Sequence, residues 1–255
     1  MRYAIVLAYD GAAYRGWQSQ LKGKTVQDAL KAAIYKITGE TVSVSAAGRT
    51  DTGVHALGQA AAFTLKKQAN PDELQYSLNS VLPDDISVRR VMAVCEDFNP
   101  IKDAREKTYR YFFTASRERN PFLDRYLWRV KYRLDIEAMK EASYALIGEH
   151  DFSAFKNRGS SVKTTVRRVF AVEWEKREDI WSFSITANGF LKQMVRIIMG
   201  TLVGIGSGRY DVDYIEYLLK SGDRRKAGIT APAQGLFFWN VKFSDWESEP
   251  RHIFF

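Results

Sequence analysis

Apolar and polar positions in the first half of the chain predict two helices set between strands. The run from Arg2 to Tyr9 is β-branched, aromatic and aliphatic, and it ends at the turn signal Asp10-Gly11, which is typical of a strand. Thr25 is an N-cap residue, and the apolar residues after it fall on one helical face up to Gly39. The other expected elements are strands at 41–47 and 59–65, a helix opened by Asn70-Pro71, and a strand at 86–95. The predicted order is βαββαβ.

The second half repeats this order with longer loops. We expect a strand at 105–114, a helix at 135–147, strands at 165–175 and 180–187, a helix from Phe190, and a closing strand at 235–243. This pattern predicts an α+β fold of two βαββαβ halves, each ferredoxin-like or RRM-like. The halves are expected to form one extended, mostly antiparallel sheet with helices on one face and a central catalytic cleft. We place the domain boundary at Asn99-Pro100, which gives domains 1–99 and 100–255.

Charge and cysteine content narrow the class of protein. The chain has 255 residues, with 38 Lys and Arg against 30 Asp and Glu, so its net charge is +8 and a polyanion is the expected partner. Cations cluster in two places: Lys156, Arg158, Lys163, Arg167 and Arg168, and then Arg224, Arg225 and Lys226. The single cysteine, Cys95, lies in an apolar run and is expected to fill the core in a reducing compartment. With neither a signal-peptide pattern nor a bilayer-length apolar segment, we expect a cytoplasmic protein without a membrane partner.

Several motifs that would imply a nucleotide, cofactor or metal are incomplete. The stretch Gly11 to Gly16 has the outline of a phosphate loop, but Trp17-Gln18 replaces the Lys and Ser or Thr that such a loop needs. The glycines at 204–208 follow a helix and indicate its end, not a dinucleotide site. The three histidines are far apart in sequence and lack zinc-ligand spacing. We therefore expect neither a cofactor nor a metal.

One acidic residue lies in an unusual setting. Asp51 follows Arg49 closely on a connection between two strands, and Gly48 and Gly53 permit a tight backbone path there. An isolated Thr-Asp-Thr-Gly would be an ordinary turn in which the Asp bonds to the backbone. The longer string from Gly48 to Ala56, GRTDTGVHA, is more specific than a turn.

That string resembles the catalytic signature of the TruA-type tRNA pseudouridine synthase family. Further motifs of the family occur in order along residues 1–243: YDG and GWQ near the N-terminus, KTYRY at 107–111, HDFSAF at 150–155, MVR at 194–196, and APAQGL at 231–236. Thr52 departs from the family, which more often has Ala there, and the tail 246–255 has no counterpart that we can place.

The resemblance implies a function and a set of site residues. It implies that the chain converts uridine to pseudouridine at positions 38, 39 and 40 of the tRNA anticodon stem-loop, and that it acts as a homodimer. Asp51 would be the nucleophile, Arg196 its charge partner, and Tyr109 a ring that stacks on the target base and relays the C5 proton. Arg49 would help hold the flipped nucleotide. The residues expected to contact the RNA backbone are Lys156, Arg158, Lys163, Arg167 and Arg168.

Two other functions fit parts of the pattern. Paired βαββαβ units also occur in non-catalytic RNA-binding proteins, although the aromatic RNP motif of those modules is absent from this sequence. A nucleoside hydrolase could use Asp51 on a small substrate, but the basic surface disfavours it. For a synthase, the residues alone do not choose between a covalent Asp51 adduct and a glycal formed by loss of the C2′ proton.

Overall fold

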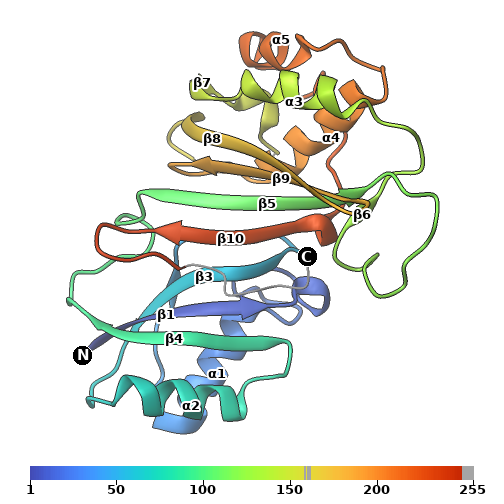
Figure 1. Ribbon diagram of the computed structural model, residues 1–255. Helices are drawn as coiled ribbons and strands as arrows, with labels where there is room; N and C mark the ends of the chain where they lie inside the picture. The colour runs from blue at the N-terminus through green and yellow to red at the C-terminus, as the bar shows by residue number, and fades with distance from the viewer. Residues whose placement is uncertain (158, 160–161, 249–255) are drawn as a thin grey trace. The chain divides into compact units, whose positions relative to one another are not determined.

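A computed structural model describes residues 1–157, 159 and 162–248 (Figure 1). The described chain divides into two compact units: residues 1–105 with the segment 237–248, and residues 106–236. The domain boundary expected at Asn99-Pro100 stays a prediction. Residues 100–105 group with the first unit, and so does the last strand, because that strand hydrogen-bonds to a strand of the first unit.

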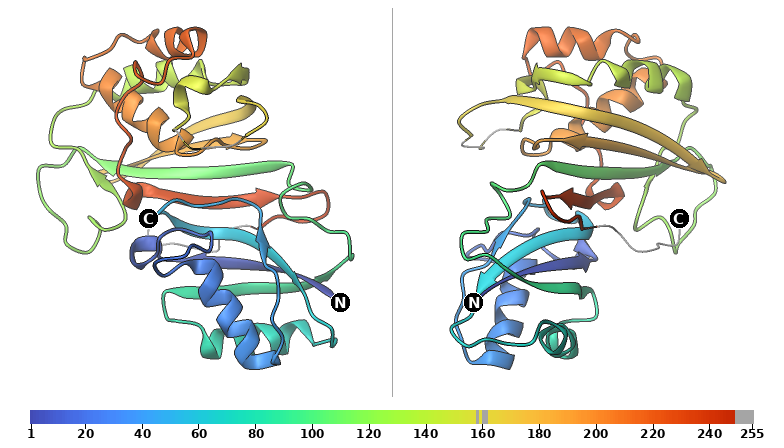
Figure 2. Two further views of the ribbon diagram at one scale, coloured as in Figure 1. Left: turned by 180° about the vertical axis from the view of Figure 1, so that it is seen from behind. Right: turned by 60° about the vertical axis from the view of Figure 1, so that its left-hand side comes forward.

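The first unit contains the predicted βαββαβ order. Its elements are β1 (Arg2–Tyr9), α1 (Val26–Thr38), β2 (Ser45–Ala46), β3 (His55–Thr64), α2 (Pro71–Val81) and β4 (Ile86–Val94), joined by β10 (Leu236–Lys242). β1 lies between β3 and β4 and is antiparallel to both, while β10 runs parallel to β3 with Phe237 opposite His55. Seen from behind, α1 lies over these strands (Figure 2).

Local signals account for the ends of α1. The Thr25 hydroxyl accepts a hydrogen bond from the backbone amide of Asp28, and Gly39 ends the helix in the left-handed conformation at φ 71°. The buried face consists of Val26, Leu30, Ala33 and Ile34, as the apolar pattern predicts. This face packs against the strands of the unit. The side chains of β1 are buried on both faces of that strand, so the unit has a continuous core.

The second unit has its own antiparallel sheet in the order β5-β9-β8-β7. Its elements are β5 (Glu106–Thr114), β6 (Trp128–Arg129), α3 (Ile136–Tyr144), β7 (Gly148–Asp151), β8 (Val166–Arg177), β9 (Ile180–Ala187), α4 (Met194–Gly206) and α5 (Tyr214–Ser221). α4 is apolar nearly all round and almost entirely buried, and it packs against α3 on one side of the strands (Figure 2).

The α+β class and the mostly antiparallel strands are confirmed, and several details differ from the sequence prediction. The strand expected at 41–47 pairs with β3 only at Ser45–Ala46, and the helix expected from Phe190 begins at Met194 because Gln193 adopts a positive φ of 62°. The strands β6 and β7 and the helix α5 were not predicted, since each is short. The central cleft between the halves stays a prediction.

The expectation for Cys95 is wrong. Its side chain is exposed just beyond the end of β4, so it does not fill the core. β4 pairs with β1, and its last residues alternate between half-buried and exposed positions, as they do at the margin of a sheet. An apolar run at such a margin reaches solvent despite its composition. Among the described residues, no helix is long and apolar enough to cross a bilayer.

Candidate active site

The loop between β2 and β3 carries Asp51 in a half-buried position. The amide of Val54 donates a 3.1 Å hydrogen bond to the Asp51 carbonyl and closes a four-residue turn. Gly53, the third residue of that turn, has a φ of 77°, which favours glycine over residues that bear a side chain. The turn leads directly into His55, the first residue of β3, so the sheet fixes one end of the loop.

The loop packs against the segment that follows β1. The amide of Trp17 donates to the Thr50 carbonyl at 3.1 Å, and the amide of Gly53 donates to the Tyr14 carbonyl at 3.3 Å. Gly16 has a φ of 83°, and a Cβ atom there would lie 2.4 Å from the Thr50 carbonyl oxygen. The GWQ motif therefore supports the Asp51 loop through backbone contact that only glycine permits.

A buried hydroxyl pair supports the same loop from the sheet. The Tyr9 hydroxyl lies 2.8 Å from the Thr50 hydroxyl. Burial raises the pKa of Tyr9 to about 12, against smaller opposing effects of hydrogen bonds to Thr50 and Gln59, so the phenol stays neutral and keeps its hydrogen. Thr50 is thus held by its carbonyl and by its side chain, directly before Asp51.

Gln59 is a site residue that the sequence prediction missed. Its fully buried amide donates to the Gly48 carbonyl at 2.7 Å and accepts a longer bond, 3.4 Å, from the Gly48 amide. The signal in the sequence is Gln59 in the otherwise apolar stretch ALGQAAAF at 56–63, since a polar residue in a buried strand must find partners. Arg49, next to Gly48, leaves its side chain exposed.

His55 is a structural part of the loop. Its ring is 1% exposed and stacks on Phe237 of β10 at a centroid distance of 4.7 Å. Its Nδ1 atom lies 3.1 Å from the amide nitrogen of Gly11 and also 3.1 Å from the Asp10 carboxylate, so both residues after β1 contact the ring. Gly11 in turn lies so close to Val54 that a Cβ atom would meet the Val54 carbonyl oxygen at 2.0 Å. The YDG motif and β10 therefore both fix the start of β3.

The second unit holds Tyr109 and Arg196. Tyr109, on β5, is 7% exposed, and its ring meets Phe190 edge-on at 4.9 Å. The half-buried Arg196, on α4, donates from Nε to the Ala231 carbonyl at 2.7 Å, while the Ala231 amide donates to the Arg196 carbonyl at 3.0 Å. This pair of bonds ties the APAQGL segment to the start of α4 and fixes the direction of the Arg196 side chain.

Tyr111 shares the face of β5 with Tyr109 but is used in packing. It is fully buried, and its hydroxyl donates to the Pro232 carbonyl at 2.8 Å. Burial raises the pKa of Tyr111, and the nearby positive charge of Arg196 opposes this effect. Arg196 therefore lies on the tyrosine side of β5. Asp51 and Arg49 belong to the first unit, and Tyr109 and Arg196 belong to the second.

The first basic cluster lies around the start of β8. Lys163 and Arg168 are exposed, while Lys156 and Arg167 are half-buried. Arg158, also expected to contact RNA, lies outside the described residues. The exposed members are available to a polyanion in solution.

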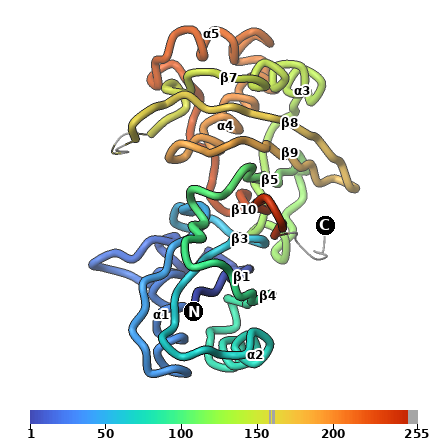
Figure 3. The backbone as a smooth tube through the Cα atoms, turned by 90° about the vertical axis from the view of Figure 1, so that its left-hand side faces the viewer, coloured from blue at the N-terminus to red at the C-terminus, as the bar shows by residue number. Residues whose placement is uncertain are grey.

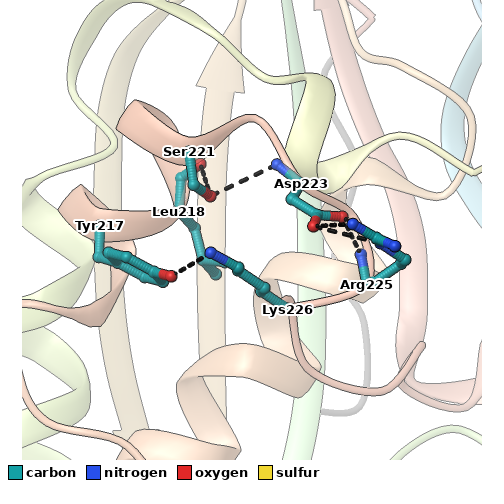
Figure 4. Close-up of polar contacts among 6 residues, drawn as sticks. All are labelled: Tyr217, Leu218, Ser221, Asp223, Arg225 and Lys226. Carbon is teal, nitrogen blue, oxygen red and sulfur yellow. Dashed lines mark hydrogen bonds and ion pairs between the residues drawn. The ribbon is translucent and has the colours of Figure 1, made fainter.

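The second basic cluster is largely engaged within its own unit (Figure 4). Arg225 forms an ion pair with Asp223 at 2.8 Å, and the Lys226 ammonium donates to the Tyr217 hydroxyl. Arg224 donates to the carbonyls of Ala227 and Gly228 and to the Thr230 hydroxyl. This cluster therefore offers less unpaired charge to a polyanion than its composition indicates.

Nothing in the described part of the chain resembles a metal centre, since no group of three or more His, Cys, Asp or Glu side chains is placed to hold an ion.

The sequence matches a known protein family over most of its length. The profile of the family described as tRNA pseudouridine synthase matches residues 5–100 and 142–244, and so covers both units. The chain belongs to the tRNA pseudouridine synthase family.

Individual relatives agree with the family match. A protein from Thermoanaerobacter sp. (strain X514), named tRNA pseudouridine synthase A, is 49% identical over 93% of this chain and 97% of its own length. Proteins of the same name from Acetivibrio thermocellus and Citrifermentans bemidjiense are 43% and 40% identical, each over 94% of this chain and over 98% and 97% of their own lengths. As a member of this family of isomerases, the chain is an enzyme and not a non-catalytic RNA-binding protein.

Gly16→Ala, with Gly39→Ala as its matched control, tests the contact between Gly16 and the backbone of the Asp51 loop. Both glycines have positive φ, so each substitution is expected to cost about 1 kcal/mol of backbone strain. A Cβ at Gly39 meets nothing within 4 Å, whereas at Gly16 it displaces the Thr50–Asp51 backbone. We expect urea unfolding to show a loss of stability in both variants, larger for Gly16→Ala, and uridine isomerisation to slow only in Gly16→Ala. Equal isomerisation rates in the two variants would contradict the role given to Gly16.

Proposed function

We propose that the chain isomerises uridine to pseudouridine at positions 38, 39 and 40 of the tRNA anticodon stem-loop. The observation that carries this proposal is the Asp51 loop, whose backbone is held on both sides of the carboxylate in a chain of the tRNA pseudouridine synthase family. The net charge of +8 and the exposed cations near β8 suit an RNA substrate.

The reaction needs few groups from the protein. The bond from ribose C1′ to N1 of uracil breaks, the base turns, and C1′ bonds to C5. The C5 hydrogen leaves as a proton, and N1 gains a proton. Nothing is oxidised or reduced, so a carboxylate, charge control and a site that excludes water are sufficient.

We assign the nucleophile role to Asp51. Its carboxylate acts on the electron-poor C1′ as a covalent partner, or it removes the C2′ proton to give a glycal, and both routes stay open. Either route needs an ionised carboxylate, and a cation stabilises that form in a site that excludes water. We assign this charge to Arg196, because its Nε bond to the Ala231 carbonyl fixes the direction of a rigid, permanently charged guanidinium at the start of α4.

Tyr109 and Arg49 are assigned to the substrate nucleotide. The edge contact with Phe190 supports the Tyr109 ring, so the ring can stack on a flipped base, and its hydroxyl can relay the C5 proton. The exposed Arg49 side chain follows a tightly held Gly48, which suits an RNA contact beside the target nucleotide. Lys156, Lys163, Arg167 and Arg168 are proposed backbone contacts.

Tritium release tests the reaction and its position. With anticodon stem-loops labelled at uridine C5, we expect tritium to appear in water without any added cofactor, because C5 loses its hydrogen when the new bond forms. Stem-loops with uridine at 38, 39 or 40 should react, and those with cytidine at all three positions should not. Release that is independent of these positions would refute the proposed site, and no release at all would refute the proposed reaction.

Asp51→Asn tests the nucleophile. The substitution keeps the size of the side chain but removes its charge, so we expect turnover to fall by about ten-thousandfold or more while tRNA affinity stays within a few-fold. The matched control is Asp84→Asn, which removes one exposed carboxylate from the same unit. Single-turnover assays and filter binding measure the two effects separately. Full activity of Asp51→Asn would remove Asp51 from the chemistry.

We also propose that the chain is a cytoplasmic homodimer that binds one tRNA across both subunits. Sedimentation of the purified protein should give twice the mass of the chain, with a single tRNA bound per dimer at saturation. A monomer that retains full activity at nanomolar concentration would contradict the dimer proposal without affecting the assignment of Asp51.

A further inference from the structure

Lys107 lies on the same face of β5 as Tyr109. The register with β9 pairs Lys107 with Ala187 and Tyr109 with Ile185 without a shift, so side chains alternate regularly along this part of the strand. Thr108 and Arg110 point to the other face, where they bond to Thr186 and Ser184. Lys107 is therefore displaced from Tyr109 by one strand repeat, or about 7 Å.

Arg167, on β8, lies close enough to Lys107 for its positive charge to act on that side chain. The small residue Ala187, at the end of β9, pairs with Lys107 on one side and with Val169 on the other. Arg167 is two residues before Val169 and so shares its face. Its guanidinium lies beside Gly189, where a Cβ atom would be 3.6 Å from Nε. Figure 3 shows β5, β9 and β8 side by side, and the register places Lys107 of β5 and Val169 of β8 on either side of Ala187.

The two cations are half-buried, and neither has an acidic partner in the part of the chain that the structure describes. Burial, and secondarily the positive charge of Arg167, lower the pKa of Lys107 to about 8, and burial lowers the pKa of Arg167. Arg167 donates to the carbonyls of Thr164 and Val166, which are neutral. Among the described residues, neither cation forms an ion pair with a carboxylate. Two like charges that lie close together and are partly withdrawn from water repel each other, and an anion bound between them relieves that repulsion.

We propose that Lys107 and Arg167 form an anion subsite that binds the RNA phosphodiester next to the nucleotide stacked on Tyr109. This proposal rests on the proposed function and extends it to a residue, Lys107, that has no other role. A planar guanidinium and a flexible ammonium together match the tetrahedral oxygens of a phosphate. A phosphodiester held one strand repeat from Tyr109 would fix the backbone on one side of the flipped nucleotide.

Binding measurements on the inactive Asp51→Asn background test the subsite. Lys107→Met removes the charge and keeps the length of the side chain, Lys107→Arg keeps the charge, and Lys220→Met is the control, because Lys220 is an 80% exposed cation on α5. We expect Lys107→Met to weaken stem-loop binding about tenfold and to lower the salt slope by about one, while the other two variants stay close to the parent. Binding by Lys107→Met that equals the Lys220→Met control would overturn the proposal.

Stem-loops with one uncharged backbone linkage show which phosphate beside the target uridine Lys107 contacts. A stem-loop with a single methylphosphonate on the 5′ or the 3′ side of the target uridine should bind the parent about tenfold more weakly at one of these linkages. At that linkage Lys107→Met should show no further loss. If Lys107→Met is as sensitive as the parent at both linkages, Lys107 does not contact a phosphate beside the target.

Thermal unfolding separates this role from a purely structural one. Because Lys107→Met removes a half-buried charge that has no acidic partner among the described residues, we expect its melting temperature at pH 7 to equal or exceed that of the parent, although it binds RNA less well. A lower melting temperature that accompanies the loss of binding, in both Lys107→Met and Lys107→Arg, would show that Lys107 acts by supporting the fold. Wild-type tritium release is the separate measure of the proposed function, so the two hypotheses can fail independently.

Discussion

The contact between Gly16 and the Thr50 carbonyl is the constraint on which the geometry of the Asp51 loop depends. The loop has few regular ladder bonds of its own, so its backbone groups take partners from the turn after β1 and from a buried glutamine. Close approach of two backbones explains the glycines at 11 and 16, and the positive φ of the turn explains Gly53. For the reaction proposed above, a carboxylate on a loop held this way would need little rearrangement before it reacts, which is a physical source of catalytic rate.

In the second unit, backbone groups likewise hold the side chains near the candidate site in place. The APAQGL segment offers the carbonyls of Ala231 and Pro232, one to Arg196 and the other to Tyr111. Gly235 lets the segment lie against β5, since a Cβ there would meet the Tyr111 ring at 2.7 Å. Backbone carbonyls thus fix a cationic and an aromatic side chain, while the buried and apolar α4 supplies a rigid base.

Net charge alone does not reveal how the cations are used. Arg224, Arg225 and Lys226 look like a polyanion site in the sequence, yet each bonds to groups of its own unit. Lys107 attracts little notice in the sequence because it stands alone in an aromatic strand, but in the structure it lies beside Arg167, and burial lowers the pKa of both side chains. The same residue type therefore stabilises the fold at one place and remains available to a substrate anion at another.

The sequence by itself determined the elements with strong local signals and the identity of the candidate nucleophile. Thr25 and Gly39 bound α1 because capping and left-handed termination act within one helical turn, and the GRTDTGVHA string marks Asp51 because its residue order is specific. Only the tertiary structure decided that β10 pairs with β3, that α4 begins after Gln193, that Cys95 is exposed, and that Gln59 holds Gly48. Strand pairing and burial depend on residues far apart in the chain, and their free energy is set by packing and desolvation that no local pattern contains.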